Sequence, residues 1–143
     1  MNTHQKVLFY THPVDGHPPE EWEAIWTIPL GANKFKLDNI PFYTKGISCD
    51  DVIEADLSSG SLIFKRLVQS SPNSTVRVIV YDERAVDKVN KHLRDIGCSV
   101  EGTGIPGYLA INVPQTSLDA ALQYLKREFD EDRLDYEEGV IRR

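Results

Sequence analysis

A polar stretch in the middle of the chain, QSSPNST at residues 69–75, separates two halves whose apolar residues follow different patterns. The stretch contains Pro72 and has no apolar periodicity, which is typical of a linker. Before it the chain shows strand-like alternation, and after it strand-like and helix-like patterns follow one another. The sequence therefore predicts two subdomains, residues 1–70 and residues 75–143, joined by the linker 69–75.

The N-terminal subdomain is expected to form a small antiparallel β-sheet or a partial barrel. Between Trp22 and Leu30 every second residue is apolar, which is the pattern of a half-buried strand. Short strands joined by tight turns are typical of such sheets. Further strands are predicted at residues 6–12, 35–37, 52–57 and 62–68, with a hairpin turn at 58–61.

The C-terminal subdomain is expected to form a ferredoxin-like βαββαβ unit, so the whole chain is predicted to be an α+β protein. Apolar residues at helical spacing mark a first helix between Asp82, a predicted N-cap, and Gly97, a predicted stop. A second helix is predicted to begin at a capping box, residues 116–119, and to carry its apolar face as far as Phe129. Strands are expected at residues 75–81, 98–102, 108–113 and 134–142.

The composition indicates a soluble globular protein. Apolar residues make up 41% of the 143 residues, and no apolar run is long enough to span a bilayer. The N-terminal sequence lacks a signal-peptide core, and the two cysteines, Cys49 and Cys98, are too few for a disulfide framework. We therefore expect a cytoplasmic protein that does not bind membranes.

The formal net charge of −6 is concentrated in one segment. Residues 128–138, EFDEDRLDYEE, contain seven acidic residues and one basic residue, and the rest of the chain carries 15 residues of each sign. Because no part of the chain is strongly basic, a nucleic-acid partner is disfavoured. The sequence instead favours a basic protein as the partner.

Residues 102–107, GTGIPG, match the G-x-G-x-x-G pattern of dinucleotide-binding turns. In such a site a helix follows the glycines, and its N-terminus holds the pyrophosphate. Here Pro106 lies inside the pattern, and the β-branched run at 108–113 predicts a strand instead of a helix. The segment is therefore predicted to be a hairpin loop, and no nucleotide cofactor is expected.

Other side chains that could carry chemistry do not form a recognisable constellation. His12, Asp15 and His17 are close in sequence, but their spacing fits no usual zinc pattern, so a solvated loop without metal is expected. Cys49 has no histidine in its segment to activate it, and Cys98 is expected to be a small buried apolar residue. The sequence therefore predicts neither an enzyme nor a cofactor.

Several segments resemble a bacterial family known as domain of unknown function 4265. They are WTIPLG at 26–31, FKLDNIPFY at 35–43, GIS at 46–48, DDVIEA at 50–55 and STVR at 74–77. The resemblance covers about residues 20–140, and it implies a small intracellular bacterial protein with no assigned chemistry. Such proteins sometimes resemble immunity proteins encoded beside contact-dependent or polymorphic toxins.

These features together predict a non-catalytic immunity protein that neutralises a cognate toxin domain, such as a basic nuclease. An acidic inhibitor is drawn to the positive field of a phosphate-binding site, and tyrosine is favoured at interface centres. The predicted partner-binding residues are Asp130, Glu131, Asp132, Asp135, Tyr136, Glu137 and Glu138. The alternative binding surface consists of Asp50, Asp51, Glu54 and Asp56.

Two other interpretations stay open. The acidic residues at the C-terminal end are equally consistent with a role in solubility alone. The chain could also be a regulatory domain of ferredoxin-like type that senses a small molecule in a groove between its subdomains. The turn after the first strand of the second subdomain, residues 81–84, is bulky and charged, which disfavours that function.

Overall fold

The computed structural model describes residues 4–143, which contain nine β-strands, two α-helices and two short 3-10 helices. The chain divides into two compact units, of which the first ends at Ser71 and the second begins at Pro72. Each unit has a hydrophobic core of its own. Within the described residues, no helix is long and apolar enough to cross a membrane.

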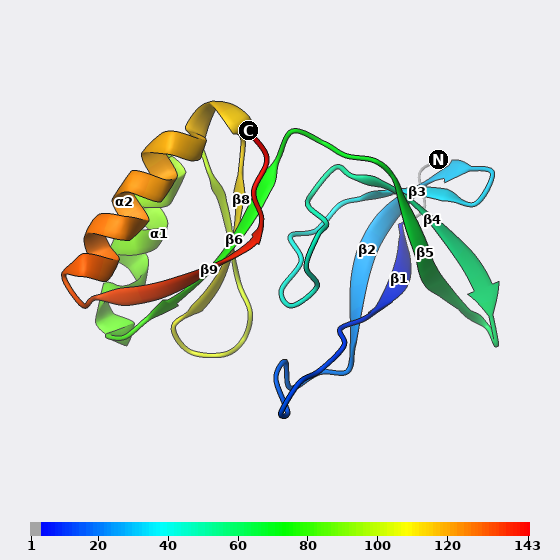
Figure 1. Cartoon of the computed structure of the whole chain (residues 1–143), viewed down its shortest axis with the longest axis horizontal. Coiled ribbons are helices and arrows are strands. Elements are labelled where there is room, and N and C mark those ends of the chain that lie inside the picture. Colours follow the sequence, from blue (N-terminus) through cyan, green and yellow to red (C-terminus); the bar gives the residue numbers. More distant parts are fainter. Residues whose placement is uncertain (1–3) are drawn as a thin grey trace. The chain divides into compact units, whose positions relative to one another are not determined.

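The five strands of the first unit form a closed barrel in the order of the sequence (Figure 1). Each strand is antiparallel to the next, so the first and the fifth run in the same direction. A short parallel pairing, in which Val7 lies opposite Leu62, closes the barrel. The strands are β1 (Gln5–Tyr10), β2 (Trp22–Gly31), β3 (Lys34–Leu37), β4 (Val52–Ser58) and β5 (Ser61–Gln69).

The closed barrel differs from the sheet or partial barrel that the sequence predicts. Alternation within single strands indicates where strands are, but it contains no information on whether the first strand meets the last. Closure pairs part of the outer edge of β1, at Val7 and Leu8, with β5. The core that fills the barrel consists of Val7, Phe9, Ile25, Phe35, Leu37, Ile47, Ile53 and Ala55.

The alternation of β2 predicts the strand correctly, but its apolar face points outward. Glu23 and Ile25 are buried, whereas Trp22 and Trp26 are 45% and 43% exposed. On the neighbouring strand, Tyr10 is exposed opposite Trp22, and their rings lie 5.2 Å apart. Large aromatic side chains that are exposed together on one face often mark an interaction site.

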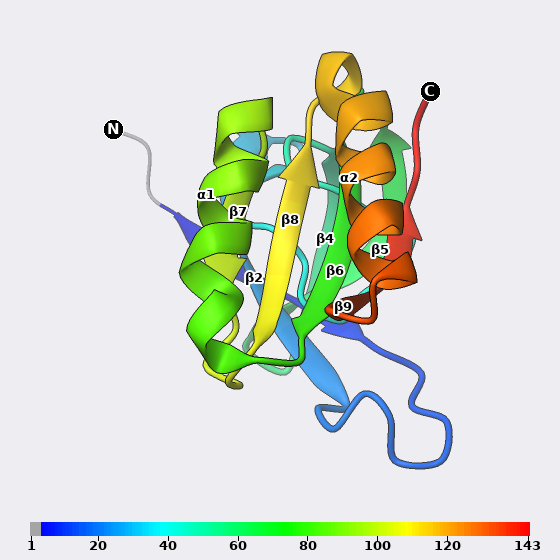
Figure 2. The ribbon, with the colours of Figure 1, turned by 90° about the vertical axis from the view of Figure 1, so that its left-hand side faces the viewer.

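The second unit follows the element order β-α-β-β-α-β. The sheet has the strand order β7-β8-β6-β9, so β6 lies between β8 and β9, antiparallel to both. The two helices lie side by side over one face of this sheet (Figure 2). The elements are β6 (Ser74–Val80), α1 (Val86–Ile96), β7 (Ser99–Gly102), β8 (Tyr108–Val113), α2 (Leu118–Asp130) and β9 (Leu134–Val140).

The core of the second unit lies between the helices and the sheet. Leu93 of α1 and Leu125 of α2 are fully buried against strand residues such as Ile111. Because side chains alternate along β6, Val76, Val78 and Val80 all point into this core. Their β-branched side chains pack well on a pleated sheet surface. The helix-covered face therefore supplies the stability of this unit.

The first helix ends at Gly97 as the sequence predicts, but the predicted N-cap Asp82 caps a 3-10 turn instead of α1, whose own N-cap is Ala85. The Asp82 carboxylate accepts a hydrogen bond from the Arg84 backbone N–H at 3.0 Å, and a 3-10 turn (Glu83–Ala85) leads into α1. Gly97 ends the helix in the left-handed region, with φ of 114°. Because a side chain is strained at this φ, glycine suits the position.

The predicted capping box at residues 116–119 is wrong, because Thr116 lies inside a 3-10 turn (Gln115–Ser117) that precedes α2. Ser117 is the N-cap residue of α2 but makes no capping hydrogen bond, and its hydroxyl instead donates to the Ile96 carbonyl of α1 at 2.9 Å. Phe129, which was predicted on the apolar face, is 48% exposed, and Tyr124 is buried in its place. Tertiary contacts therefore override the local capping pattern here.

The GTGIPG segment is a hairpin loop between β7 and β8, as predicted. Gly107 has a φ of 78°, its carbonyl accepts from the Val80 N–H at 2.8 Å, and a Cβ there would lie 2.6 Å from the Val80 carbonyl oxygen. Gly104 has a φ of 85° but an ideal Cβ at that position meets nothing within 4 Å. Gly107 therefore permits a close backbone approach between this loop and Val80.

Replacing Gly107 with alanine is expected to lower the free energy of unfolding by about 2–4 kcal/mol, because both the positive φ and the clash with Val80 are unfavourable. Gly104→Ala is the matched control, and it should cost only about 1–2 kcal/mol because only the backbone conformation is strained. Urea unfolding followed by far-ultraviolet circular dichroism measures both, since α1 and α2 belong to this unit. Equal losses in the two variants would contradict the close approach.

Candidate functional site

The acidic segment runs from the end of α2 through a turn into β9, which is an edge strand of the second unit's sheet. Because side chains alternate along a strand, β9 places Asp135 and Glu137 on one face and Tyr136 and Glu138 on the other. Tyr136 packs against the helix-covered core. The predicted binding residues therefore do not form one continuous surface.

Two of the predicted residues are engaged in ion pairs within the unit. Asp130 pairs with Lys126 at 2.9 Å across one helical turn. Glu137 accepts from the Nε of Arg77 at 2.8 Å, and the Arg77 side chain is almost fully buried. The Arg77 guanidinium lies over Gly139, where a Cβ would come within 3.0 Å of it. Reversing the charge of Glu137 would thus disturb the fold as well as any binding.

The remaining predicted acids are exposed. Within residues 4–143, Glu131, Asp132, Asp135 and Glu138 have no ion-pair partner. Asp135 lies opposite Ile79 of β6. The side chain of Ile79 is 49% exposed, and that of Tyr81, two residues further along the chain, is 54% exposed. We call the four residues Ile79, Tyr81, Asp132 and Asp135 the Tyr81 surface.

The electrostatics of Tyr81 show that it lies close to the two acids. Partial desolvation raises the pKa of Tyr81, and the charges of Asp135 and Asp132 raise it further. An exposed aromatic ring beside carboxylates is suited to contact a basic residue, through both its face and its hydroxyl group. Ile79 and Tyr81 were not among the predicted site residues, although they alternate with the buried Val78 and Val80 in the sequence, which was a signal for them.

The alternative acidic group lies in the first unit and is largely neutralised. Asp51 is fully buried, and its carboxylate accepts from the N–H groups of Ser48 and Ser71, each at 2.8 Å. Glu54 pairs with both Lys65 and Arg66, and Asp56 shares Lys65 at 3.5 Å. Asp50 is exposed in a left-handed turn, with φ of 69°. These four residues therefore do not present a common acidic surface.

The segment with His12, Asp15 and His17 is an exposed loop, in which Val14 and His17 pair with each other by two backbone hydrogen bonds. Asp15 and Gly16 have φ values of 54° and 75°, which make the tight turn of this small hairpin. The described residues contain no group of three or more histidine, cysteine, aspartate or glutamate side chains that could hold a metal ion.

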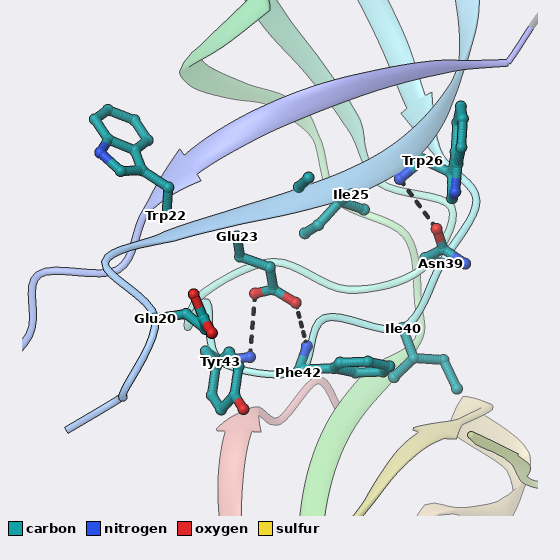
Figure 3. Close-up of a pocket in the computed structure, with 10 residues that line it drawn as sticks. Glu20, Trp22, Glu23, Ile25, Trp26, Asn39, Ile40, Phe42 and Tyr43 are labelled. Carbon is teal, nitrogen blue, oxygen red and sulfur yellow. Dashed lines mark hydrogen bonds between the residues drawn. The ribbon is translucent and has the colours of Figure 1, made fainter. Parts of the chain in front are cut away.

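A pocket of about 350 Å³ lies on the barrel between β2 and the loop at residues 39–43 (Figure 3). This volume is in the range of small ligand sites. Four of its ten lining residues are aromatic, and the lining also includes two carboxylates and the side chain of Asn39. The residues around it are Glu20, Trp22, Glu23, Ala24, Ile25, Trp26, Asn39, Ile40, Phe42 and Tyr43.

Glu23 fixes the loop that forms one wall of this pocket. Its buried carboxylate accepts from the backbone N–H groups of Phe42, Tyr43 and Thr44 at 2.6, 3.1 and 2.9 Å, and from the Thr44 hydroxyl at 2.8 Å (Figure 3). Burial raises the pKa of Tyr43, and the charges of Glu20 and Glu23 raise it further. The sequence does not predict this pocket, because Glu23 is buried in a strand whose alternating apolar residues, such as Trp22 and Trp26, face outward.

The two sheets with their two helices make the chain an α+β protein with two units. A crystal structure described as a novel structure of a hypothetical protein from Neisseria gonorrhoeae has a similar fold, with a TM-score of 0.77 and 18% sequence identity. The similarity covers 100% of this chain and 97% of that chain, and at this identity it shows the fold alone.

The chain belongs to the family described as Domain of unknown function (DUF4265), whose model matches residues 23–136. This confirms the family resemblance that the sequence segments indicate. The family description states no activity, and no curated protein matches the chain. The function must therefore be inferred from the surfaces described above.

Replacing Glu23 with glutamine is expected to destabilise the barrel by about 2 kcal/mol, because an amide group would then face backbone donors in a buried site. Both tryptophans lie on β2, so tryptophan fluorescence during urea unfolding reports on this unit. Glu21→Gln, an exposed neighbour, should have an effect within about 0.5 kcal/mol. Comparable losses in both variants would show that the Glu23 hydrogen bonds do not hold the loop.

Cys98 is expected to resist alkylation in the folded protein. Burial raises its pKa to about 11, so only about one molecule in a thousand carries the thiolate at pH 8. A Cys49→Ser variant leaves Cys98 as the remaining thiol, and mass spectrometry after iodoacetamide treatment measures its modification. Modification should require urea, and rapid labelling without denaturant would contradict the burial.

Proposed function

We propose that this chain is a non-catalytic binding protein that recognises a basic protein partner through the Tyr81 surface. In the more specific form of the proposal it is a cytoplasmic immunity protein, and its partner is a basic toxin domain such as a nuclease. The observation that carries the proposal is that exposed Ile79 and Tyr81 lie beside Asp132 and Asp135, which have no ion-pair partner within the described residues.

The chemistry of this surface supports a protein partner. Tyrosine buries a large area with few rotatable bonds, and it is enriched among residues that dominate binding energy. Ile79 adds an apolar contact next to it, and the carboxylates around both residues favour lysine or arginine on the partner. Glu131, in the turn before β9, adds a further exposed negative charge.

Electrostatic attraction contributes mainly to the rate of association. The net charge of −6 resides in the segment at residues 128–138, so a basic partner experiences a directed field as it approaches. Aromatic and apolar contacts with Tyr81 and Ile79 would then slow dissociation. This division of roles suits an inhibitor that must capture its target quickly and retain it.

We also assign the second unit to the ferredoxin-like plan. The support is its β-α-β-β-α-β order together with the strand order β7-β8-β6-β9, in which the first strand of the unit lies between its third and fourth strands. In this plan the sheet face opposite the helices is a common place for recognition. Asp135 and Ile79 lie on that face, since their neighbours in the strands point to the helix-covered core.

The double charge reversal Glu131→Lys with Asp135→Lys is expected to weaken binding to the cognate toxin domain by about 10- to 100-fold, mainly through slower association. The partner to use is the C-terminal domain of a secreted protein encoded by the adjacent gene. Surface plasmon resonance at two salt concentrations measures the rates, and co-expression with the toxin domain measures protection of growth.

The matched control is Asp95→Lys with Asp119→Lys, which makes the same change of charge elsewhere on the second unit. Both acids are in exposed ion pairs, with Lys91 and Arg143, and such pairs contribute little to stability. Unchanged binding in the Glu131 and Asp135 variant, or an equal loss in the control, would remove the Tyr81 surface from the proposal. A neighbouring gene with no secreted product would contradict the immunity role.

A further inference from the structure

The pocket on the barrel contains an unpaired strand edge. β2 pairs with β1 from Trp22 to Thr27, but its other edge pairs with β3 only from Thr27 onward. Residues 22–26 therefore have no neighbouring strand on that side within the described chain, and the loop at residues 39–43 lies there instead (Figure 3). An unpaired edge presents backbone donors and acceptors that can bind another strand.

The hydrogen bonds at both ends of this segment show which backbone groups face the pocket. At one end the Thr11 N–H donates to the Glu21 carbonyl at 2.9 Å, so the backbone carbonyl of Glu21 points toward the side of β1. At the other end the Trp26 N–H donates to the Asn39 side chain at 3.0 Å, and the Trp26 carbonyl accepts from the Asp38 N–H at 2.9 Å.

In an antiparallel strand, successive residues direct their backbone N–H and carbonyl groups to opposite sides. The backbone groups of Ala24 therefore point to the same side as those of Trp26. The N–H and the carbonyl of Ala24 therefore point away from β1 and toward the pocket, whose lining includes Ala24. Among the described residues neither group has a hydrogen-bond partner. The small side chain of Ala24 also lets another backbone approach closely.

The walls of the pocket determine what kind of segment fits. Trp22 and Trp26 are about 13 Å apart along the strand, which leaves room between the indoles for the side chains of an added strand. Phe42 and Tyr43 line the opposite side (Figure 3). Aromatic walls of this kind favour apolar, β-branched and cationic side chains.

The charge of the pocket favours a basic side chain. Glu20 and Glu23 contribute two carboxylates to the lining, and the lining contains no lysine, arginine or histidine. Glu23 is occupied by the loop N–H groups, whereas Glu20 is exposed and has no ion-pair partner within the described residues (Figure 3). Lys6 lies over the Trp26 ring, 4.9 Å from its centroid, so this aromatic face already attracts a cation.

We propose that the edge of β2 at Ala24, between Trp22 and Trp26, binds an extended segment of a partner protein by strand addition, with Ala24 supplying the backbone hydrogen bonds and Glu20 binding a basic side chain of that segment. In this mode main-chain hydrogen bonds provide affinity, and pockets for alternate side chains provide specificity. The site lies in the barrel and does not involve the Tyr81 surface, so either proposal can fail without the other.

The test uses the ¹⁵N-labelled chain of 143 residues and a pool of acetylated and amidated pentapeptides with arginine at the centre. We expect the pool to shift the backbone amide signal of Ala24 at about 1 mM peptide. A second pool, with the central amide N-methylated, should bind at least tenfold more weakly because it lacks the donor. A third pool, with glutamate at the centre, should bind at least fivefold more weakly.

Variants of the protein separate the backbone contact from the charge. Ala24→Pro removes an N–H that β1 does not use, and it should weaken binding of the arginine pool at least tenfold. Glu20→Gln should weaken it about fivefold, while the control Glu21→Gln should not change it. If Ala24→Pro does not fold, the N-methylated pool still tests the same hydrogen bond from the ligand's side.

Three outcomes would overturn the proposal. The first is that no pool shifts the Ala24 signal, and the second is that the N-methylated pool binds as tightly as the unmodified pool. The third is that agmatine, a small cation without a peptide backbone, produces the same shift with the same affinity, which would identify a small-molecule site. The Glu131 and Asp135 charge-reversal variant should bind the arginine pool normally, because it leaves the barrel unchanged.

Discussion

The carboxylate of Glu23 is the interaction on which the shape of the barrel's surface depends. It accepts hydrogen bonds from three consecutive backbone N–H groups in the loop at residues 42–44. A charged acceptor is strong enough to organise a loop that has no strand of its own. One buried side chain therefore both fixes the loop and leaves the strand edge beside it open.

In the second unit, ion pairs within the fold determine which acidic residues stay exposed. Neighbouring carboxylates repel one another, and an ion pair with a nearby cation offsets this repulsion. Asp130 pairs with Lys126 in this way, and Glu137 pairs with Arg77. The acids that lie beyond such cations stay exposed in the turn and on β9. Local pairing thus reduces a long acidic segment to a few exposed carboxylates, and Tyr81 lies beside two of them.

The sequence predicts the elements better than the sites. Periodicity and end signals such as Gly97 depend on local chemistry, so they locate the end of the first helix and most strands correctly. The outward direction of Trp22 and Trp26, the barrel closure and the role of Ser117 depend on residues distant in sequence. The candidate surfaces also depend on residues that are distant in sequence. Tyr81 lies near Asp135, and Glu23 contacts Thr44, only in the folded chain.

The presence of two separate cores affects how stability in this protein can be measured. Units with their own cores need not unfold in one transition, so a single free energy of unfolding is not defined in advance for the whole chain. Both tryptophans lie in the barrel, and both α-helices lie in the second unit. Fluorescence and far-ultraviolet dichroism therefore follow different units. Coincident transitions by the two probes would show that the units are coupled, and separate transitions would assign each loss of stability to one unit.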